Sequence, residues 1–198
     1  KFFFDRLLAI FMIFILSPLF VFISLSILFF SSSNIFFVHS RIGKDGKNFN
    51  LYKFRTMKHS RDKILAEYFN NHPKEKIYWD ENQKLKNDPR ITRIGYFLRE
   101  FSLDELPQIF NVLKGDMSFI GPRPILDAEK KKYDKNFDYY KKVKPGISGL
   151  WQVSGRNDTS YEDRIKFDVE YIQKQSFIID LKIFLKTFYV VFTRKGAY

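Results

Sequence analysis

The stretch SLDELPQIFNVLKG, residues 102–115, predicts an amphipathic helix near the middle of the chain. Gly115 marks its end. Ser102 and Glu105 have the spacing of a capping box, in which the side chain of each accepts a backbone N–H bond from the other. This box gives the acidic start of the helix a structural explanation. The apolar residues recur at helical spacing: Leu106, Ile109, Phe110 and Leu113.

The same acidic residues also have a functional interpretation. A helix N-terminus attracts phosphate through its free amides and its dipole. Asp104 and Glu105 are adjacent carboxylates there, and they would repel each other and a phosphate unless a cation lay between them. With Mg²⁺ bound to both, Asp104 could attack phosphorus and form an acyl phosphate. Capping and catalysis are compatible, so both interpretations stay open.

Three arginines accompany this pair in sequence. Arg99 precedes Asp104 by five residues, Arg123 stands between two prolines, and Arg156 follows a glycine. The planar guanidinium suits bidentate phosphate contacts. Each arginine alone resembles an ordinary surface or structural residue, whereas the three together indicate a phosphate site.

Residues 7–30 form an apolar segment without a charged side chain. At about 1.5 Å per residue, a straight helix of this length reaches roughly 36 Å, more than a hydrocarbon core of about 30 Å. Proline bends or interrupts a helix at Ser17-Pro18, where the Ser17 hydroxyl should meet the freed carbonyl of residue 14. Basic residues flank both ends, which favours a re-entrant membrane helix over a spanning one. We assign residues 1–33 to it.

Residues 34–198 are expected to form one domain of α+β fold that is mainly helical. Residues 34–57 predict a β-hairpin with a turn at Asp45-Gly46, and residues 60–87 predict a polar helical insertion. Gly- and Pro-rich stretches at 115–124 and 145–157 are interpreted as loops. Residues 161–194 are helical by pattern. Their amphipathic end suits either a helix in the membrane interface or a core helix with lysines facing water.

The formal net charge of +12 suits nucleic acid, an anionic membrane surface or phosphorylated substrates. The apolar segment favours the last two, so we expect anionic membrane lipids and no nucleic acid. The chain has no cysteine, which excludes disulfides and thiolate metal sites. A bound metal would therefore be a hard ion such as Mg²⁺.

Three linked stretches resemble the bacterial sugar transferase family in order and spacing: RIGKDGKNFNLYKFRTM (41–57), NDPRITRIGYFLREFSLDELPQIFNVLKGDMSFIGPRP (87–124) and KPGISGLWQVSGRN (144–157). These are monotopic phosphoglycosyl transferases, which begin polysaccharide assembly on the cytoplasmic face of the bacterial inner membrane. The resemblance implies a catalytic domain over residues 34–198. Asp104 would attack the β-phosphorus of a UDP-sugar, releasing UMP, and the sugar phosphate would pass to undecaprenyl phosphate.

The resemblance also implies roles for other residues. Glu105 matches the Mg²⁺-binding partner of the nucleophile, and Ser17-Pro18 matches the break in the re-entrant helix. Mg²⁺ and nearby arginines are expected to keep the pKa of Asp104 low. Whether the chain forms a homodimer is left open. The residues expected to bind substrate are Arg99, Arg123, Arg156, Lys53 and Arg55.

The insertion WDENQKLKNDPRIT (79–92) and the ending Gly196-Ala197-Tyr198 look like the hexose-1-phosphate branch of the family. We expect galactose first, with glucose or an N-acetylhexosamine as alternatives. Members of this branch often carry further N-terminal helices and another domain, so this sequence resembles part of such a chain or a short natural form. Two rival functions are a glycosyltransferase that releases UDP and a non-catalytic membrane-anchored module that binds nucleic acid or anionic lipid.

Overall fold

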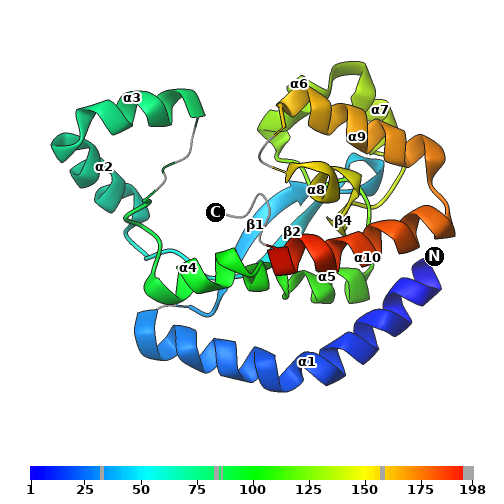
Figure 1. Cartoon of the computed structure of the whole chain (residues 1–198), viewed down its shortest axis with the longest axis horizontal. Helices are drawn as coiled ribbons and strands as arrows, with labels where there is room; N and C mark the ends of the chain where they lie inside the picture. Colours follow the sequence, from blue (N-terminus) through cyan, green and yellow to red (C-terminus); the bar gives the residue numbers. More distant parts are fainter. Residues whose placement is uncertain (32–33, 83–84, 86, 157–158, 194–198) are drawn as a thin grey trace.

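The computed structural model describes residues 1–31, 34–82, 85, 87–156 and 159–193. In these ranges helices predominate over two small two-stranded sheets, so the predicted mainly helical α+β class is confirmed (Figure 1). Two features that belong to the family resemblance, the ending at residues 196–198 and Asn157, lie outside the described residues.

Helix α1 (Phe2–Ser31) is continuous, and Figure 1 shows that it bends near its middle. Pro18 lies inside it and offers no N–H to the carbonyl of Phe14. The Ser17 hydroxyl donates to that carbonyl over 2.8 Å instead, as predicted. The helix therefore bends at the predicted position without being interrupted.

One side of α1 is apolar and exposed, and the other packs on the rest of the fold. Phe2–Phe30 is, among the described residues, the one helix long and apolar enough to cross a membrane by length and composition. Phe14, Phe22 and Phe29 are strongly exposed. A surface of this kind in water would be unfavourable, which supports a membrane location. The re-entrant topology stays a prediction.

The predicted hairpin is present. Strand β1 (Phe36–Ile42) pairs antiparallel with β2 (Asn48–Phe54), with Phe36 opposite Phe54 and Ile42 opposite Asn48. The connection is a short 3-10 turn, η1 (Lys44–Gly46), in which Asp45 and Gly46 have φ of 59° and 73°. Asp-Gly pairs adopt such left-handed angles readily, which explains the turn.

Helix α5 (Gln108–Lys114) joins the hairpin to α1. Its Asn111 is fully buried, accepts a bond from the Tyr52 N–H over 3.1 Å and donates to the Asn50 carbonyl over 2.7 Å. This amide thus pairs with the free edge of β2 as another strand would. The buried core around it consists of Ala9, Leu51, Ile109, Val112 and Met117.

The predicted capping box is wrong. Ser102 has a left-handed backbone with φ of 55° and makes no side-chain cap. Residues Leu103–Glu105 form a separate 3-10 turn, η2, because Pro107 cannot donate to the carbonyl of Leu103 and a new helix begins after it. The Glu105 carboxylate is bound by Lys53 of β2 instead of by the Ser102 amide.

The two stretches interpreted as loops contain regular structure. Strand β3 (Ser118–Ile120) pairs in parallel with β4 (Gly146–Ser148), and α8 (Leu150–Ser154) follows. These strands are too short to show alternation, which is why the pattern missed them. A Cβ on Gly146 would lie 2.1 Å from the Gly121 nitrogen, so glycine permits the close pairing. The short elements between them are η3 (Asp127–Glu129), α6 (Lys130–Tyr133), η4 (Asp134–Asn136) and α7 (Phe137–Tyr140).

The predicted helix over residues 161–194 is two helices, α9 (Tyr161–Lys174) and α10 (Phe177–Thr193). Gln175 has an extended backbone, and the Ser176 hydroxyl accepts a bond from the Ile179 N–H, which starts the second helix. In α10 Ile183 and Val190 are buried while Phe177, Phe188 and Phe192 are exposed. The helix therefore packs on the core and also presents an exposed apolar surface. Its location in the membrane interface stays a prediction.

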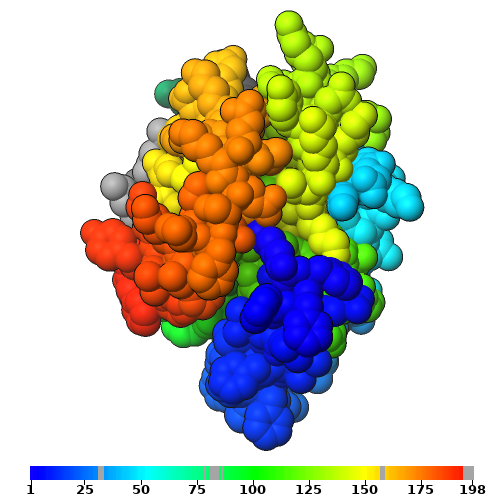
Figure 2. Space-filling model, turned by 90° about the vertical axis from the view of Figure 1, so that its right-hand side faces the viewer, coloured from blue at the N-terminus to red at the C-terminus, as the bar shows by residue number. Residues whose placement is uncertain are grey.

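The start of α1 is fastened to α10. Lys1 pairs with Asp180 over 2.8 Å and donates to the hydroxyl of Tyr171 over 2.6 Å. The Lys144 ammonium lies 3.8 Å from the centre of the Phe2 ring. Figure 2 shows these first residues reaching between α10 and the segment that contains Lys144. These contacts fix the end of the apolar helix to the C-terminal half of the fold.

The predicted helical insertion forms α2 (Arg61–Asn71) and α3 (Pro73–Asn82), which stand apart from the remaining elements in Figure 1. The two helices are separated at His72, whose φ of −136° and ψ of 66° are not helical. Arg90 lies 4.7 Å from the Trp79 ring centre and links the insertion to the segment before α4 (Arg93–Glu100).

The role of Asn111 leads to a stability prediction. Asn111→Leu keeps the volume but leaves the Tyr52 N–H and the Asn50 carbonyl without this partner, so the free energy of unfolding should fall by about 2–4 kcal/mol. Denaturant unfolding in detergent measures it. Asn70→Leu, on the exposed face of α2, is the matched control and should change stability little. Equal stability of the two variants would show that the Asn111 amide does not stabilise the edge of β2.

Candidate active site

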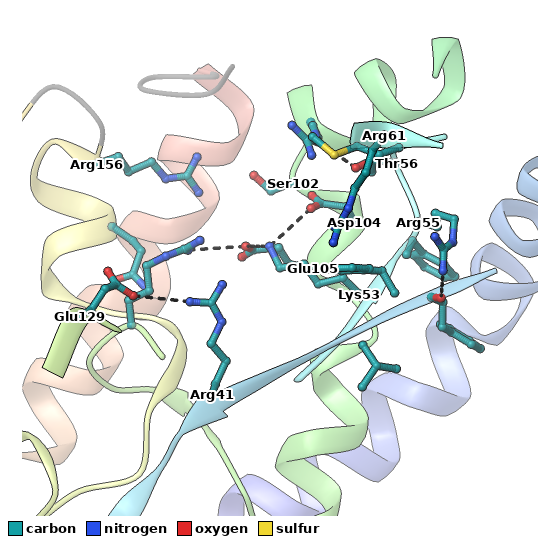
Figure 3. Close-up of a pocket in the computed structure, with 18 of the residues that line it drawn as sticks. Arg41, Lys53, Arg55, Thr56, Arg61, Ser102, Asp104, Glu105, Glu129 and Arg156 are labelled. Carbon is teal, nitrogen blue, oxygen red and sulfur yellow. Dashed lines mark hydrogen bonds and ion pairs between the residues drawn. The ribbon is translucent and has the colours of Figure 1, made fainter. Parts of the chain in front are cut away.

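A cavity of about 1470 Å³ opens between the hairpin, the η2 turn, α8 and the start of α9. It contains every charged residue that the sequence proposed for substrate, nucleophile or metal (Figure 3). Segments far apart in the chain thus meet at one place. The predicted residues that line it are Lys53, Arg55, Arg99, Asp104, Glu105, Arg123 and Arg156.

The two acids lie on the η2 turn at the centre of this cavity. Lys53 Nζ donates to Glu105 Oε1 over 2.6 Å and lies 3.6 Å from Asp104 Oδ2. Arg123 Nη1 lies 3.6 Å from the same Glu105 oxygen. Ser102, directly before the turn, holds a left-handed backbone that costs a non-glycine residue about 1–2 kcal/mol. The turn therefore directs both carboxylates toward the cations at some cost in strain.

The environment shifts the pKa values of the two carboxylates in opposite directions. Burial acts to raise the pKa of Glu105, but the charges of Lys53 and Arg123 outweigh it and lower that pKa to about 2. For Asp104 burial is the larger effect and, with the neighbouring Glu105 charge, raises its pKa despite Lys53. Without a metal ion, desolvation of Asp104 therefore exceeds the attraction of the cations, and a low pKa with Mg²⁺ bound stays a prediction.

The remaining predicted residues occupy different parts of the wall. Arg99 Nε donates to the Thr56 hydroxyl over 2.9 Å, close to Asp104. Arg156 follows Gly155 with a left-handed φ of 48°. Figure 3 places Arg156 at one end of the pocket and Arg55, whose guanidinium donates to the carbonyls of Asn34 and Phe36, at the other.

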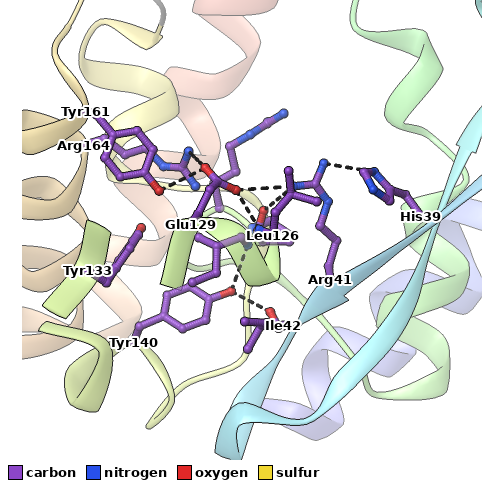
Figure 4. A network of polar contacts seen from close by, with 12 residues as sticks. His39, Arg41, Ile42, Leu126, Glu129, Tyr133, Tyr140, Tyr161 and Arg164 are labelled. Carbon is purple, nitrogen blue, oxygen red and sulfur yellow. Dashed lines mark hydrogen bonds and ion pairs between the residues drawn. The ribbon is translucent and has the colours of Figure 1, made fainter. Parts of the chain in front are cut away.

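Sequence reasoning missed a second charged group at the Arg156 end (Figure 4). Glu129 accepts bonds from Arg164 and from the Tyr161 hydroxyl, each over 3.0 Å, and lies 3.6 Å from Arg41. The Arg164 guanidinium also lies 5.0 Å from the centre of the Trp151 ring. These residues come from segments with no shared motif spacing, so only the fold brings them together. Arg41 and Trp151 lie within stretches that resemble the family (41–57 and 144–157), and this could have indicated that they belong to the site.

Cations outnumber acids in this cavity. Among the described residues its wall contains ten Lys or Arg side chains and three carboxylates, Asp104, Glu105 and Glu129. A cavity of this charge attracts polyanions and suits a ligand with two or more phosphates.

The acids can be tested as a metal site. No group of three or more His, Asp or Glu side chains within the described residues could hold a metal by itself. Asp104 and Glu105 supply the hard oxygen donors that Mg²⁺ prefers, and Mg²⁺ is commonly held by one or two carboxylates with phosphate oxygens and water. Lys53 already binds one Glu105 oxygen, so a metal would share that carboxylate with it. The residues fit Mg²⁺ as part of a site that a substrate completes.

Comparison with known proteins agrees with this geometry. The sequence model of the bacterial sugar transferase family matches residues 1–194. The chain is 44% identical over 195 residues to the exopolysaccharide production protein ExoY of Sinorhizobium fredii, spanning 98% of this chain and 86% of that protein. It is 52% identical over 160 residues to a UDP-galactose-lipid carrier transferase of Erwinia amylovora, spanning 81% of this chain and 34% of that protein.

A third relative is an undecaprenyl-phosphate galactose phosphotransferase of Salmonella typhimurium, which is 46% identical over 195 residues. The match spans 98% of this chain but 41% of that protein. The chain therefore covers most of some relatives and well under half of others. It belongs to the bacterial sugar transferase family.

Asp168, behind the Glu129 group, gives a pH prediction. Burial raises its pKa to about 6, although Tyr133 donates to its carboxylate over 2.5 Å. The folded state thus binds this proton more tightly than the unfolded state, and its stabilising effect is lost as pH rises from about 4 to about 6. The difference in unfolding free energy between the wild type and Asp168→Asn should fall by about 2 kcal/mol between about pH 4.5 and pH 7.5.

Denaturant unfolding at a series of pH values measures this difference. The control Asp62→Asn makes the same replacement at a carboxylate that is exposed on α2. A difference for Asp168→Asn that rises with pH would show that the carboxylate is stabilised in its charged form.

Proposed function

We propose that the chain transfers a sugar-1-phosphate from a UDP-sugar to undecaprenyl phosphate and releases UMP, with Asp104 as the nucleophile. The main support is the pair Asp104 and Glu105, held at the centre of a cationic cavity with different proton affinities. Membership of the bacterial sugar transferase family and the names of its relatives support the same reaction.

The environment explains why Asp104 would be the nucleophile and Glu105 its partner. Glu105 is engaged by Lys53 at 2.6 Å and by Arg123 at 3.6 Å, which reduces its basicity. Asp104 lies 3.6 Å from Lys53 and has a raised proton affinity, and a more basic oxygen attacks phosphorus more readily. Of the two carboxylates, Asp104 is therefore the better nucleophile.

The proposed reaction has two displacements at one phosphorus. An Asp104 oxygen bonds to the β-phosphorus of the donor as the bond to the bridging oxygen breaks, and UMP leaves with the electron pair. An oxygen of undecaprenyl phosphate then attacks the same phosphorus and restores the Asp104 carboxylate. Arg123 and Arg156 would bind the phosphate oxygens of the donor.

Mg²⁺, when bound through Asp104 and Glu105, would neutralise phosphate charge and polarise the phosphorus. Lys53 would keep Glu105 ionised for this contact, and the pair would orient Asp104. Since burial raises the pKa of Asp104, its deprotonation and metal binding should favour each other.

Galactose-1-phosphate is the first choice of transferred group. Two of the relatives named above carry galactose in their names, while a 38% identical relative in Escherichia coli is named as a UDP-glucose:undecaprenyl-phosphate glucose-1-phosphate transferase. UDP-glucose and UDP-N-acetylhexosamines are therefore the alternatives to compare. The site should lie at the cytoplasmic face of the inner membrane, where α1 would attach the chain mainly through its apolar surface.

The nucleophile can be tested directly. Wild-type protein incubated with UDP-galactose alone should acquire the mass of a hexose phosphate, and Asp104→Asn should not acquire it. UMP release in the presence of undecaprenyl phosphate should fall at least about a thousandfold in Asp104→Asn, because no covalent intermediate can form. Intact-mass spectrometry and nucleotide chromatography measure the two results, with the exposed Asp127→Asn as control.

The released nucleotide separates this proposal from its rivals. UDP in place of UMP would indicate transfer of the sugar alone. Binding of nucleic acid or lipid that depends steeply on salt, with no turnover and no effect of Asp104→Asn, would indicate a non-catalytic module.

Metal dependence tests the role of Glu105. Removal of Mg²⁺ with EDTA should abolish adduct formation, and added Mg²⁺ should restore it. Glu105→Gln removes one charged ligand and should raise the Mg²⁺ concentration for half-maximal rate at least about tenfold. Glu67→Gln, on exposed α2, should keep the wild-type Mg²⁺ response. Full activity of the wild type in EDTA would exclude this role.

A further inference from the structure

A second hollow lies outside the active-site cavity, where α8, α9 and α10 meet. Its volume is about 310 Å³, at the lower end of the range of about 300–1,000 Å³ for small-ligand pockets. Its apolar wall is formed by Leu150 and Val153 of α8 and by Ile179 and Ile183 of α10. Val153 and Ile183 are buried, whereas the lysines that also line the hollow are exposed. The hollow is therefore apolar at its bottom and charged at its entrance.

The entrance of this hollow has an excess of positive charge. It contains three lysines and one acid, which gives a net charge of +2. Lys174 pairs with Glu170 over 2.8 Å, so the excess belongs to Lys182 and Lys186. These two residues are four positions apart on α10, which places their side chains one turn apart on the same side of the helix. One phosphate group could therefore contact both ammonium groups.

Lys182 and Lys186 lie at the border between two faces of α10. Ile183 is on the buried face, while Leu181 and Leu185 are 46% and 60% exposed on the apolar face. At about 100° per residue, both lysines fall between these two faces. A helix that lies with its apolar face in a bilayer holds such lysines at the depth of the lipid headgroups. The entrance of the hollow would then meet the phosphate layer.

The exposed face of α10 lies between this hollow and the start of α1. Asp180 is at the other border of the same apolar face, and its carboxylate pairs with Lys1 over 2.8 Å. Figure 2 shows the first residues of α1 beside α10 on one side of the molecule. The hollow thus adjoins the surface through which both apolar helices would contact a membrane.

Helix α8 separates the hollow from the catalytic pair. Leu150 and Val153 line the hollow, whereas Trp151 and Gln152 of the same helix line the active-site cavity. A ligand in the hollow would therefore have α8 between itself and Asp104. This argues against the lipid acceptor as its occupant, because the phosphate of the acceptor has to reach the nucleophile.

We propose that this hollow binds one anionic phospholipid of the surrounding leaflet. Its phosphate pairs with Lys182 and Lys186, and the first part of one acyl chain packs against Leu150, Val153 and Ile183. A zwitterionic lipid would bring its own cation beside the lysines and should bind less tightly. The proposal goes beyond the transfer reaction, because this lipid is bound without being consumed.

Native mass spectrometry of the full chain, released from detergent micelles that contain phosphatidylglycerol or phosphatidylcholine, tests the lysines. The wild type should retain one phosphatidylglycerol with an affinity about thirtyfold higher than for phosphatidylcholine. The double variant Lys182→Gln with Lys186→Gln should bind phosphatidylglycerol only as weakly as phosphatidylcholine. The matched control, Lys74→Gln with Lys76→Gln, removes two exposed lysines of α3 and should keep the wild-type preference.

A variant without a change of charge tests the apolar wall. Ile179→Trp should fill part of the hollow and lower the affinity for phosphatidylglycerol about tenfold, because about two methylene groups lose their apolar contacts. Ile179→Leu keeps the volume and should bind as the wild type does. Should Ile179→Trp misfold, Leu150→Trp fills the hollow from α8. Glycerol 3-phosphate, which has no acyl chain, should not displace the bound lipid.

Four outcomes would overturn the proposal. Equal retention of the two phospholipids, or an equal loss in the α3 control, would show attraction by overall charge alone. Displacement by glycerol 3-phosphate would indicate a site for free phosphate. Retained undecaprenyl phosphate that phosphatidylglycerol cannot displace would assign the hollow to the acceptor. A wild-type dimer that dissociates in Ile179→Trp would show that a second copy of the chain covers the hollow.

Discussion

The ion pair between Lys53 and Glu105 is the contact on which the candidate site depends. Two adjacent carboxylates on a buried turn would repel each other and lose hydration, so they need a cation within direct reach. Lys53 Nζ, 2.6 Å from Glu105, provides it and ties the end of β2 to the η2 turn. Burial raises the pKa of both acids, but Lys53, which lies closer to Glu105 than to Asp104, outweighs this effect only at Glu105, together with Arg123. One contact thus joins two elements and gives the acids different chemistry.

Lys53 can hold this position because β2 is fixed on both of its edges. β1 pairs with one edge, and the buried Asn111 amide of α5 pairs with the other. α5 also contacts α1, so the apolar helix, the central helix and the hairpin form one packed unit. A helix with an exposed apolar surface and a cavity lined by cations are ordinarily incompatible environments. Here the hairpin separates them, with apolar side chains toward α1 and Lys53 toward the cavity.

Local patterns in the sequence predicted the elements whose signals are local. The Asp45-Gly46 turn, the bend at Pro18 and the Ser17 bond depend on neighbouring residues and were predicted correctly. The capping box failed because Glu105 has a distant partner, Lys53, that no local rule contains. β3 and β4 were missed because short parallel strands show no alternation. The resemblance to the family indicated the acids and arginines that line the cavity. The Glu129 group was not predicted, because its members come together only through tertiary contacts.

The excess of cations implies that the protein alone is not the most favourable state of this site. Arg41, Arg123 and Arg164 lie close enough to influence one another, and for Arg41 burial and the neighbouring Arg123 charge lower the pKa of the guanidinium. Within the described residues, Nε of Arg41 and Nε and Nη2 of Arg164 are buried without a hydrogen-bond partner. Such groups reduce stability unless a ligand supplies acceptors. A diphosphate bound nearby would offset the repulsion among these arginines and accept bonds from their unpaired N–H groups. Part of its binding free energy would then come from removing these two unfavourable terms of the unliganded protein.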